Sequence, residues 1–216
     1  MDFSVITLPM VVNLALLLLI GLGPKIALVP FLEKTGKMAP EQQRAIGTTM
    51  VKTAVITALV LFVFGALLMR LLHVSSGSVS VAGGVVLLIM ALQMLMRPGE
   101  PHEPENEAPL DHEQLAIYPL AIPYLLNPVG IAVLLVASSE VDGWAPAALV
   151  VGLVLAVGAL DWVVFRNADK ISKRLNPSTL VISEVIFGIL LAALAVELAV
   201  AGLGNLGIIE PVVQHH

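Results

Sequence analysis

Polar and charged side chains are scarce in the apolar stretches of this 216-residue chain, so each one there is a candidate for chemistry. Lys25 stands out, since a cation at the centre of a membrane helix costs about 2.5 to 3.5 kcal/mol. Close to a helix break, its amine offers a positive charge to the carboxylate of a solute. In the alternative interpretation, Lys25 lies near a membrane surface and extends its amine into water.

Three carboxylates in other apolar stretches are possible charge partners for Lys25, namely Asp161, Glu184 and Glu197. Each can instead face a headgroup region, because Asp161 lies close to the charged segment after it, and Glu184 and Glu197 lie toward the two ends of the last apolar stretch. Asn127 directly precedes Pro128, and we expect its side chain to cap a helix that begins there. Capping is compatible with contact to a solute.

Several classes of chemistry are disfavoured by what the chain lacks. It contains no cysteine, which excludes disulfides and thiolate ligands, and His73, His102 and His112 all lie between the apolar stretches. No Ser-His-Asp order, phosphate-binding glycine loop or HExxH motif is present. The net charge is −5, and no basic stripe alternates with aromatic residues. We therefore expect no enzyme, no cofactor, no metal site and no nucleic-acid partner.

The elements that position these residues are membrane spans. The chain is 58% hydrophobic and only 12% charged, whereas soluble domains are about one quarter charged. A span needs roughly 20 apolar residues. The sequence predicts six spans, at about 5–32, 46–69, 78–96, 115–138, 144–165 and 179–204. We expect the first to be a retained span rather than a cleaved signal peptide, because it lacks a positive start and a small-residue cleavage site.

The cations predict the orientation of the chain, because positively charged loops stay in the cytoplasm. Outside the spans, only Arg70 lies in a segment assigned to the outer side. The cations of the first, third and fifth connectors are Lys34, Lys37, Arg44, Arg97, Arg166, Lys170, Lys173 and Arg174. The sequence therefore predicts a multi-pass protein of the plasma membrane with both termini outside the cytoplasm.

The chain divides into two sets of three spans. We predict a first three-helix repeat at 1–96, an acidic cytoplasmic linker at 97–114, a second three-helix repeat at 115–206 and a tail at 207–216. Because each set has an odd number of spans, the second set enters the membrane upside down relative to the first. This arrangement is typical of transporters with inverted repeats.

Helix-breaking residues cluster in the first span of each set. As one helix of about 28 residues, the first span would reach about 42 Å, which exceeds the hydrocarbon thickness of about 30 Å. Interrupted backbone survives in a membrane only against protein or a water-filled cavity. We expect both breaks to face one solute site, although a simple proline kink is the alternative for each. The predicted binding residues are Gly23, Pro24, Lys25, Asn127, Pro128 and Gly130.

Four stretches along the chain have a recognisable sequence: VPFLEKTGKMAPEQQRAIG, VAGGVVLLIMALQML, AIYPLAIPYLLNPVGIAVLLVAS and GILLAALAVE. In this order they resemble the MarC-like family of integral membrane proteins. The resemblance implies two inverted three-helix repeats with a substrate near the two proline breaks. For some relatives it implies transport of small neutral amino acids. The family's first break usually reads Asp-Pro-x-Gly-Asn, whereas this chain has Gly-Pro-Lys-Ile-Ala at 23–27. Its second break usually reads Gly-Pro-Gly, whereas this chain has Asn-Pro-Val-Gly at 127–130.

These observations favour a transporter of a small polar solute, an amino acid or a small carboxylate, that works by alternating access at the paired breaks. Its expected partners are the lipid bilayer, the solute and a coupling ion, either a proton or sodium, and an oligomer is compatible with the sequence. The alternative is a membrane interaction or assembly protein that does not transport and that acts through its cytoplasmic loops.

Overall fold

The computed structural model describes residues 7–96, 111–172 and 177–209, without the side chains at 172, 177–180, 183 and 184. In this part of the chain every regular element is a helix. The elements are α1 (Leu8–Gly21), α2 (Pro24–Thr35), α3 (Pro40–Leu72), α4 (Ser76–Met96), α5 (His112–Leu115), η1 (Ala116–Leu125), α6 (Pro128–Glu140), α7 (Trp144–Arg166), α8 (Ala168–Ser172) and α9 (Pro177–Asn205).

Two of the predicted spans are interrupted. The first consists of α1 and α2, which are separated by Leu22 and Gly23, and Pro24 occupies the first turn of α2. Proline is tolerated there because the first helical N–H groups have no intrahelical partner. The second consists of η1 and α6, which bend by 71° at their junction. The predicted helix breaks are thus confirmed, and the second is the sharper.

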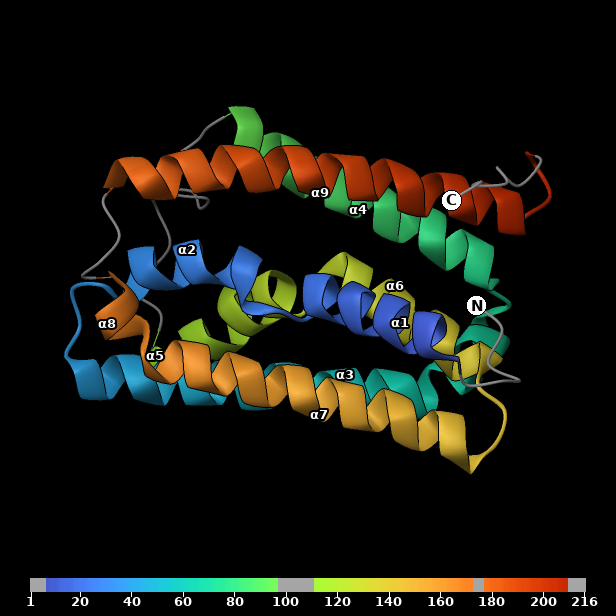
Figure 1. Ribbon diagram of the computed structural model, residues 1–216, viewed down its shortest axis with the longest axis horizontal. Helices are drawn as coiled ribbons and strands as arrows, with labels where there is room; N and C mark the ends of the chain where they lie inside the picture. Colours follow the sequence, from blue (N-terminus) through green and yellow to red (C-terminus); the bar gives the residue numbers. More distant parts are fainter. Residues whose placement is uncertain (1–6, 97–110, 173–176, 210–216) are drawn as a thin grey trace.

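The helices form three layers (Figure 1). α3 packs on α7 at one side, and α4 packs extensively on α9 at the other. The interrupted elements α1–α2 and η1–α6 lie between these two pairs. Glycines let α4 and α9 approach closely, because a Cβ at Gly84 would lie only 2.7 Å from the Ala195 carbonyl oxygen.

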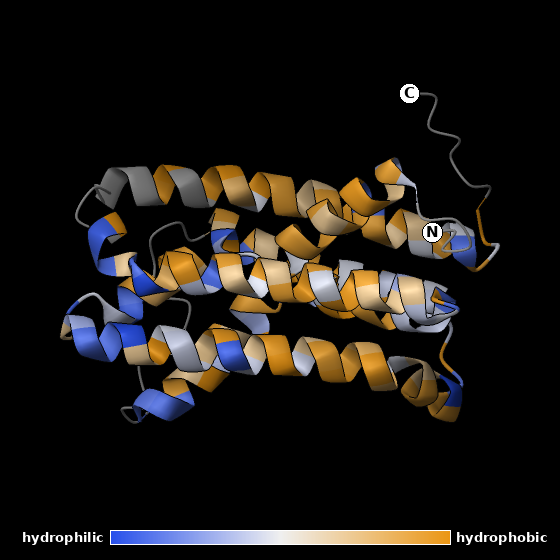
Figure 2. Ribbon diagram, turned by 60° about the horizontal axis from the view of Figure 1, so that its bottom comes forward, coloured by the Kyte–Doolittle hydropathy of each residue, from blue (hydrophilic) through white to orange (hydrophobic). Residues whose placement is uncertain are grey.

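The outer surface carries large apolar side chains, as a lipid-facing surface does. Ile56 and Phe64 on α3 are 61% and 56% exposed, and Ile189 on α9 is 57% exposed. Figure 2 shows hydrophobic residues along the length of the helices and hydrophilic ones gathered mainly at the end where α2 and α3 meet. Among the described residues, five helical segments are long and apolar enough to span a membrane, with α1 and α2 together counted as one. The bent pair formed by α5–η1 and α6 makes a sixth if it is counted as a single span.

Some predicted connectors are helical. α3 begins at Pro40 rather than at 46, because Pro40 takes the first helical position and the Gln42 side chain accepts a hydrogen bond from the Ala39 N–H at 3.1 Å. With 33 residues, α3 reaches about 50 Å and extends beyond the hydrocarbon layer. Two short helices, α5 and α8, lie in the third and fifth predicted connectors.

The all-helical membrane fold is therefore confirmed over the described residues. The inverted relation between the two sets of helices stays a prediction, as do the domain boundaries and the orientation of the termini. Most of the acidic linker, 97–110, and the side chain of Glu184 lie outside what the structure describes.

Candidate functional site

The two interrupted elements cross each other at Asn127. Its backbone N–H donates to the Gly21 carbonyl oxygen at 2.9 Å, and its side-chain Nδ2 donates to the Ile20 carbonyl oxygen at 2.7 Å. The end of α1 leaves these carbonyls without helical partners. Asn127 is fully buried, so its amide replaces the water that would otherwise satisfy them.

The same side chain caps α6, as the sequence predicted. Asn127 Oδ1 accepts hydrogen bonds from the backbone N–H groups of Val129 and Gly130, at 2.9 and 3.2 Å. One amide therefore satisfies donors at the start of one half-helix and an acceptor at the end of the other. This arrangement fixes the position of α6 against α1.

The backbones of the two elements touch where they cross. A Cβ on Gly21 would collide with the Gly130 backbone, and a Cβ on Gly130 would collide with the Gly21 carbonyl. Only glycine at both positions permits this approach. Gly21 and Gly130 are both buried.

The start of α2 differs from the start of α6. Gly23 occupies the N-cap position of α2 and offers no side-chain hydrogen bond. Gly23 is itself required, since a Cβ there would collide with the Leu19 carbonyl oxygen. The break in the first half therefore has bare backbone, with Lys25 in the first turn of the helix that follows.

Two cavities adjoin this crossing on its α4–α9 side. One, of about 440 Å³, is lined by Lys25 together with Glu197 and apolar residues of α9. The other, of about 600 Å³, extends along α1 and α6. Ile20 and Glu197 line both cavities. The polar residues in the wall of the larger cavity are Asn13, Ser80, Glu140, Glu197 and Asn205.

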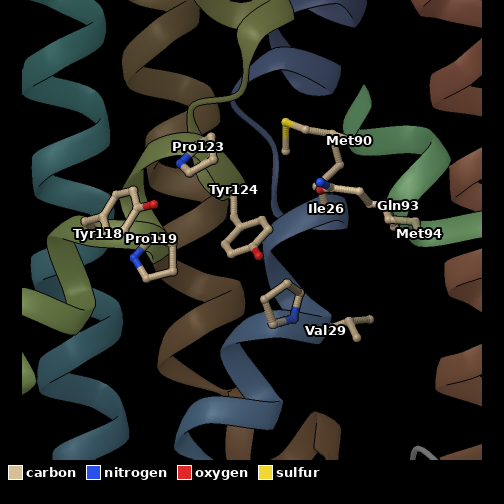
Figure 3. A pocket seen from close by; sticks show the side chains of 10 residues that line it. Ile26, Val29, Met90, Gln93, Met94, Tyr118, Pro119, Pro123 and Tyr124 are labelled. Atoms are coloured by element: carbon tan, nitrogen blue, oxygen red, sulfur yellow. The ribbon is translucent and has the colours of Figure 1, made fainter. Parts of the chain in front are cut away.

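A third cavity, of about 180 Å³, lies between α2, α4 and η1 (Figure 3). Tyr118 and Tyr124 of η1 bring hydroxyl groups to it, and Gln93 of α4 brings an amide. The peptide bonds before Pro119 and Pro123 are cis, and the helical conformation of η1 is interrupted at Tyr118 and Ile122. Ile26 lines both this cavity and the one that contains Lys25.

Most of the predicted binding residues gather at the crossing. Gly23, Asn127, Pro128 and Gly130 are buried there. Pro24 is half-buried beside them. Lys25 is exposed toward the cavity it shares with Glu197.

Asp161 lies elsewhere. It is fully buried, and neither carboxyl oxygen has a hydrogen-bond partner, so it does not pair with Lys25. On the same face of α7, a Cβ at Gly158 would collide with Val55 of α3, and the Phe165 ring packs edge-on against Phe31 of α2 at 5.0 Å between centroids. Asp161 therefore lies on the face of α7 that packs against α3 and α2.

Sequence reasoning missed two contributions to this site. The Ile20 carbonyl carries no side-chain signal. Gly21 belongs to the cluster of breakers in the first span, but its contact with Gly130 is identified only by the fold. Glu197, one of the carboxylates considered as a partner for Lys25, lines the same cavity as that lysine.

The fold and the crossing define a class of protein: a multi-pass α-helical membrane protein with two interrupted helices that meet in its interior. The family model for MarC family integral membrane proteins matches residues 8–206. The chain belongs to the MarC family of integral membrane proteins.

Relatives from several organisms match this chain over most of their length. The UPF0056 inner membrane protein YhgN of Escherichia coli K12 is 27% identical over 197 residues, which cover 89% of this chain and 95% of that protein. A UPF0056 membrane protein of Methanocaldococcus jannaschii is 26% identical over 184 residues, which cover 84% of this chain and 90% of the relative. The UPF0056 membrane protein YvbG of Bacillus subtilis is 27% identical over 180 residues, which cover 80% of this chain and 84% of that protein. No solved structure matches this chain.

Proposed function

We propose that the protein is a membrane transporter, not an enzyme, and that it carries a small polar solute such as an amino acid or a small carboxylate. One observation carries this proposal: the two interrupted helices meet through Asn127 and border cavities with polar residues in their walls. Interrupted helices at the interface of two helical sets are the common construction of solute sites in transporters.

Lys25 is the residue that sets the charge of the solute in this proposal. Its amine and the Glu197 carboxylate belong to the wall of one cavity, so that wall offers groups of both signs. A zwitterionic solute matches both groups, and a carboxylate matches Lys25. The uncapped start of α2 lies beside this lysine and also favours negative charge.

Alternating access is compatible with the position of the cavities. The cavity of about 600 Å³ follows α1, whereas the cavity of about 180 Å³ lies beside α2. The crossing lies between them, at the junction of α1 and α2. In the proposed cycle, movement of the α4–α9 pair against the crossing opens one cavity as it closes the other, with a proton or sodium ion as the coupling ion.

A thermal-shift screen of amino acids, organic acids and phosphorylated solutes against the purified protein identifies the solute, because a ligand that binds the folded state raises its apparent stability. Uptake of the radiolabelled hit into proteoliposomes then tests transport. We expect Lys25→Ala to reduce uptake at least tenfold while unfolding stays unchanged. Lys52→Ala is the matched control, because Lys52 is an exposed lysine in the apolar part of α3 that lines none of these cavities.

Normal uptake by Lys25→Ala would show that the binding residues are wrongly assigned, even if transport itself is right. Deletion of 99–110 separates transport from the alternative role in interaction or assembly. A transporter tolerates this deletion, whereas a protein that acts through its acidic linker loses its partner. Absence of both a stabilising solute and any uptake would refute the transporter proposal.

A further inference from the structure

A basic pocket lies at one end of the α3–α7 pair, far from the crossing. It has a volume of about 440 Å³ and is lined by Arg44, Ala45, Thr48, Thr49 and Arg166. Two helices supply the arginines, and the lining contains no carboxylate. Two guanidinium groups on one small pocket repel each other unless an anion lies between them.

The position of this pocket along α7 fits the surface of a membrane. Arg166 is in the last turn of α7, and its guanidinium lies 4.7 Å from the centre of the Trp162 ring. Trp162 is 39% exposed and Val163 beside it is 51% exposed, so apolar surface flanks the pocket. Tryptophan is enriched at the membrane–water interface, where its ring sits at headgroup level.

The chemistry of the lining selects a phosphate. Each guanidinium presents planar N–H donors that fit phosphate oxygens in pairs. Thr49 brings a further hydroxyl donor to the pocket. The Thr48 hydroxyl donates its proton to the Arg44 carbonyl oxygen at 2.8 Å, so the arginines and Thr49 supply the donors for the phosphate.

The pocket lies at the end of the molecule that the cations assign to the cytoplasm. Anionic phospholipids concentrate in the cytoplasmic leaflet, and basic pockets between membrane helices on that side bind their headgroups. A soluble phosphate gains nothing from the apolar flank of the pocket, whereas the acyl chains of a lipid pack against it.

We propose that Arg44 and Arg166 form a binding site for the phosphate of an anionic phospholipid, held between α3 and α7 at the cytoplasmic surface. This inference does not depend on the transport proposal. The bound lipid joins the start of α3 to the end of α7, and it therefore stabilises one side of the bundle.

The experiment places the full-length protein in lipid nanodiscs of phosphatidylglycerol or of phosphatidylcholine and measures both the unfolding temperature and, by native mass spectrometry, the lipid retained. Phosphatidylglycerol is expected to raise the unfolding temperature and to stay bound. Each of the variants Arg44→Gln and Arg166→Gln weakens retention about fivefold, from about 1 kcal/mol for each cation near the surface. Arg70→Gln, at the opposite end of α3, is the matched control and retains the lipid.

Retention by the double variant Arg44→Gln/Arg166→Gln equal to that of the parent would overturn the proposal. Equal loss in Arg70→Gln would overturn it as well, because binding would then follow net charge and not this pocket. A rise in unfolding temperature with inorganic phosphate in detergent equal to the rise with phosphatidylglycerol would also overturn it, by identifying a soluble phosphate as the ligand. Circular dichroism of all variants confirms that the helices are intact, which is expected because both arginines are exposed.

Discussion

Asn127 is the residue whose replacement tests the crossing most sharply, because one side chain performs two separable tasks. Asn127→Ala removes the cap of α6, which costs about 1 kcal/mol. It also removes the hydrogen bond to the Ile20 carbonyl oxygen; such bonds between membrane helices contribute about 0.6 kcal/mol on average and up to about 1.7. The expected loss in the free energy of unfolding is therefore about 2 kcal/mol.

Asn127→Ser separates the two tasks. Serine still caps a helix about as well as asparagine, but it is too short to reach the Ile20 carbonyl. The expected loss is therefore about 1 kcal/mol, between the parent and Asn127→Ala. The control is Asn167→Ala, because Asn167 also donates to a backbone carbonyl, that of Val163 at 2.8 Å, but does so at an exposed position.

The assay is denaturant unfolding in detergent, followed by the fluorescence of Trp144 and Trp162. Asn167→Ala is expected to change the free energy of unfolding by no more than about 0.5 kcal/mol, as surface substitutions generally do. Asn127→Ala no more destabilising than Asn167→Ala would contradict the proposed role of Asn127 at the crossing. A loss for serine equal to that for alanine would show that the cap carries no measurable part of the loss, and no loss for serine would show that the bridge to Ile20 carries none.

Three other substitutions test the packing. Gly130→Ala is expected to destabilise the protein by more than about 1 kcal/mol, because its Cβ collides with the Gly21 carbonyl. Gly152→Ala should stabilise it by about 0.5 to 1 kcal/mol, since nothing lies near its Cβ and alanine is the better helix former. Equal effects of these two substitutions in the same unfolding assay would contradict the close approach of Gly130 to Gly21. Asp161→Leu is expected to raise the free energy of unfolding by about 1 to 3 kcal/mol, because it removes a buried carboxyl with no hydrogen-bond partner. Destabilisation by Asp161→Leu would show that the carboxyl has a partner in solution.

The sequence predicted the features of the fold that depend on local composition. The lengths of the apolar stretches predicted the spans, and the prolines and glycines at 21–24 and 127–130 predicted the helix breaks. The cap by Asn127 was predictable because asparagine before proline at a helix start acts locally. The early start of α3 was not predicted, since Glu41 and Arg44 indicated a connector, although Pro40 and Gln42 in fact begin the helix.

The partners across the fold could not be predicted in the same way. The bonds from Asn127 to the end of α1 join residues more than one hundred positions apart, and their acceptors are backbone carbonyls that every residue has. Lys25 was expected near one of three carboxylates, and only the fold shows that Glu197 lines its cavity whereas Asp161 lies on the face of α7 that packs against α3 and α2. Which face of α7 or α9 points inward depends on packing that an apolar sequence without strong periodicity does not specify.

Solute protection of a single cysteine tests directly whether the solute occupies the cavity beside the crossing. The chain has no native cysteine, so Ile20→Cys introduces the only thiol. The measurement is its rate of modification by a water-soluble maleimide, with Asp142→Cys, at an exposed position of the connector between α6 and α7, as the control. We expect Ile20→Cys to react and the solute found by thermal shift to slow the reaction, with no effect of the solute on Asp142→Cys. An unreactive Ile20→Cys, or a rate unaffected by that solute, would contradict a solute site in this cavity.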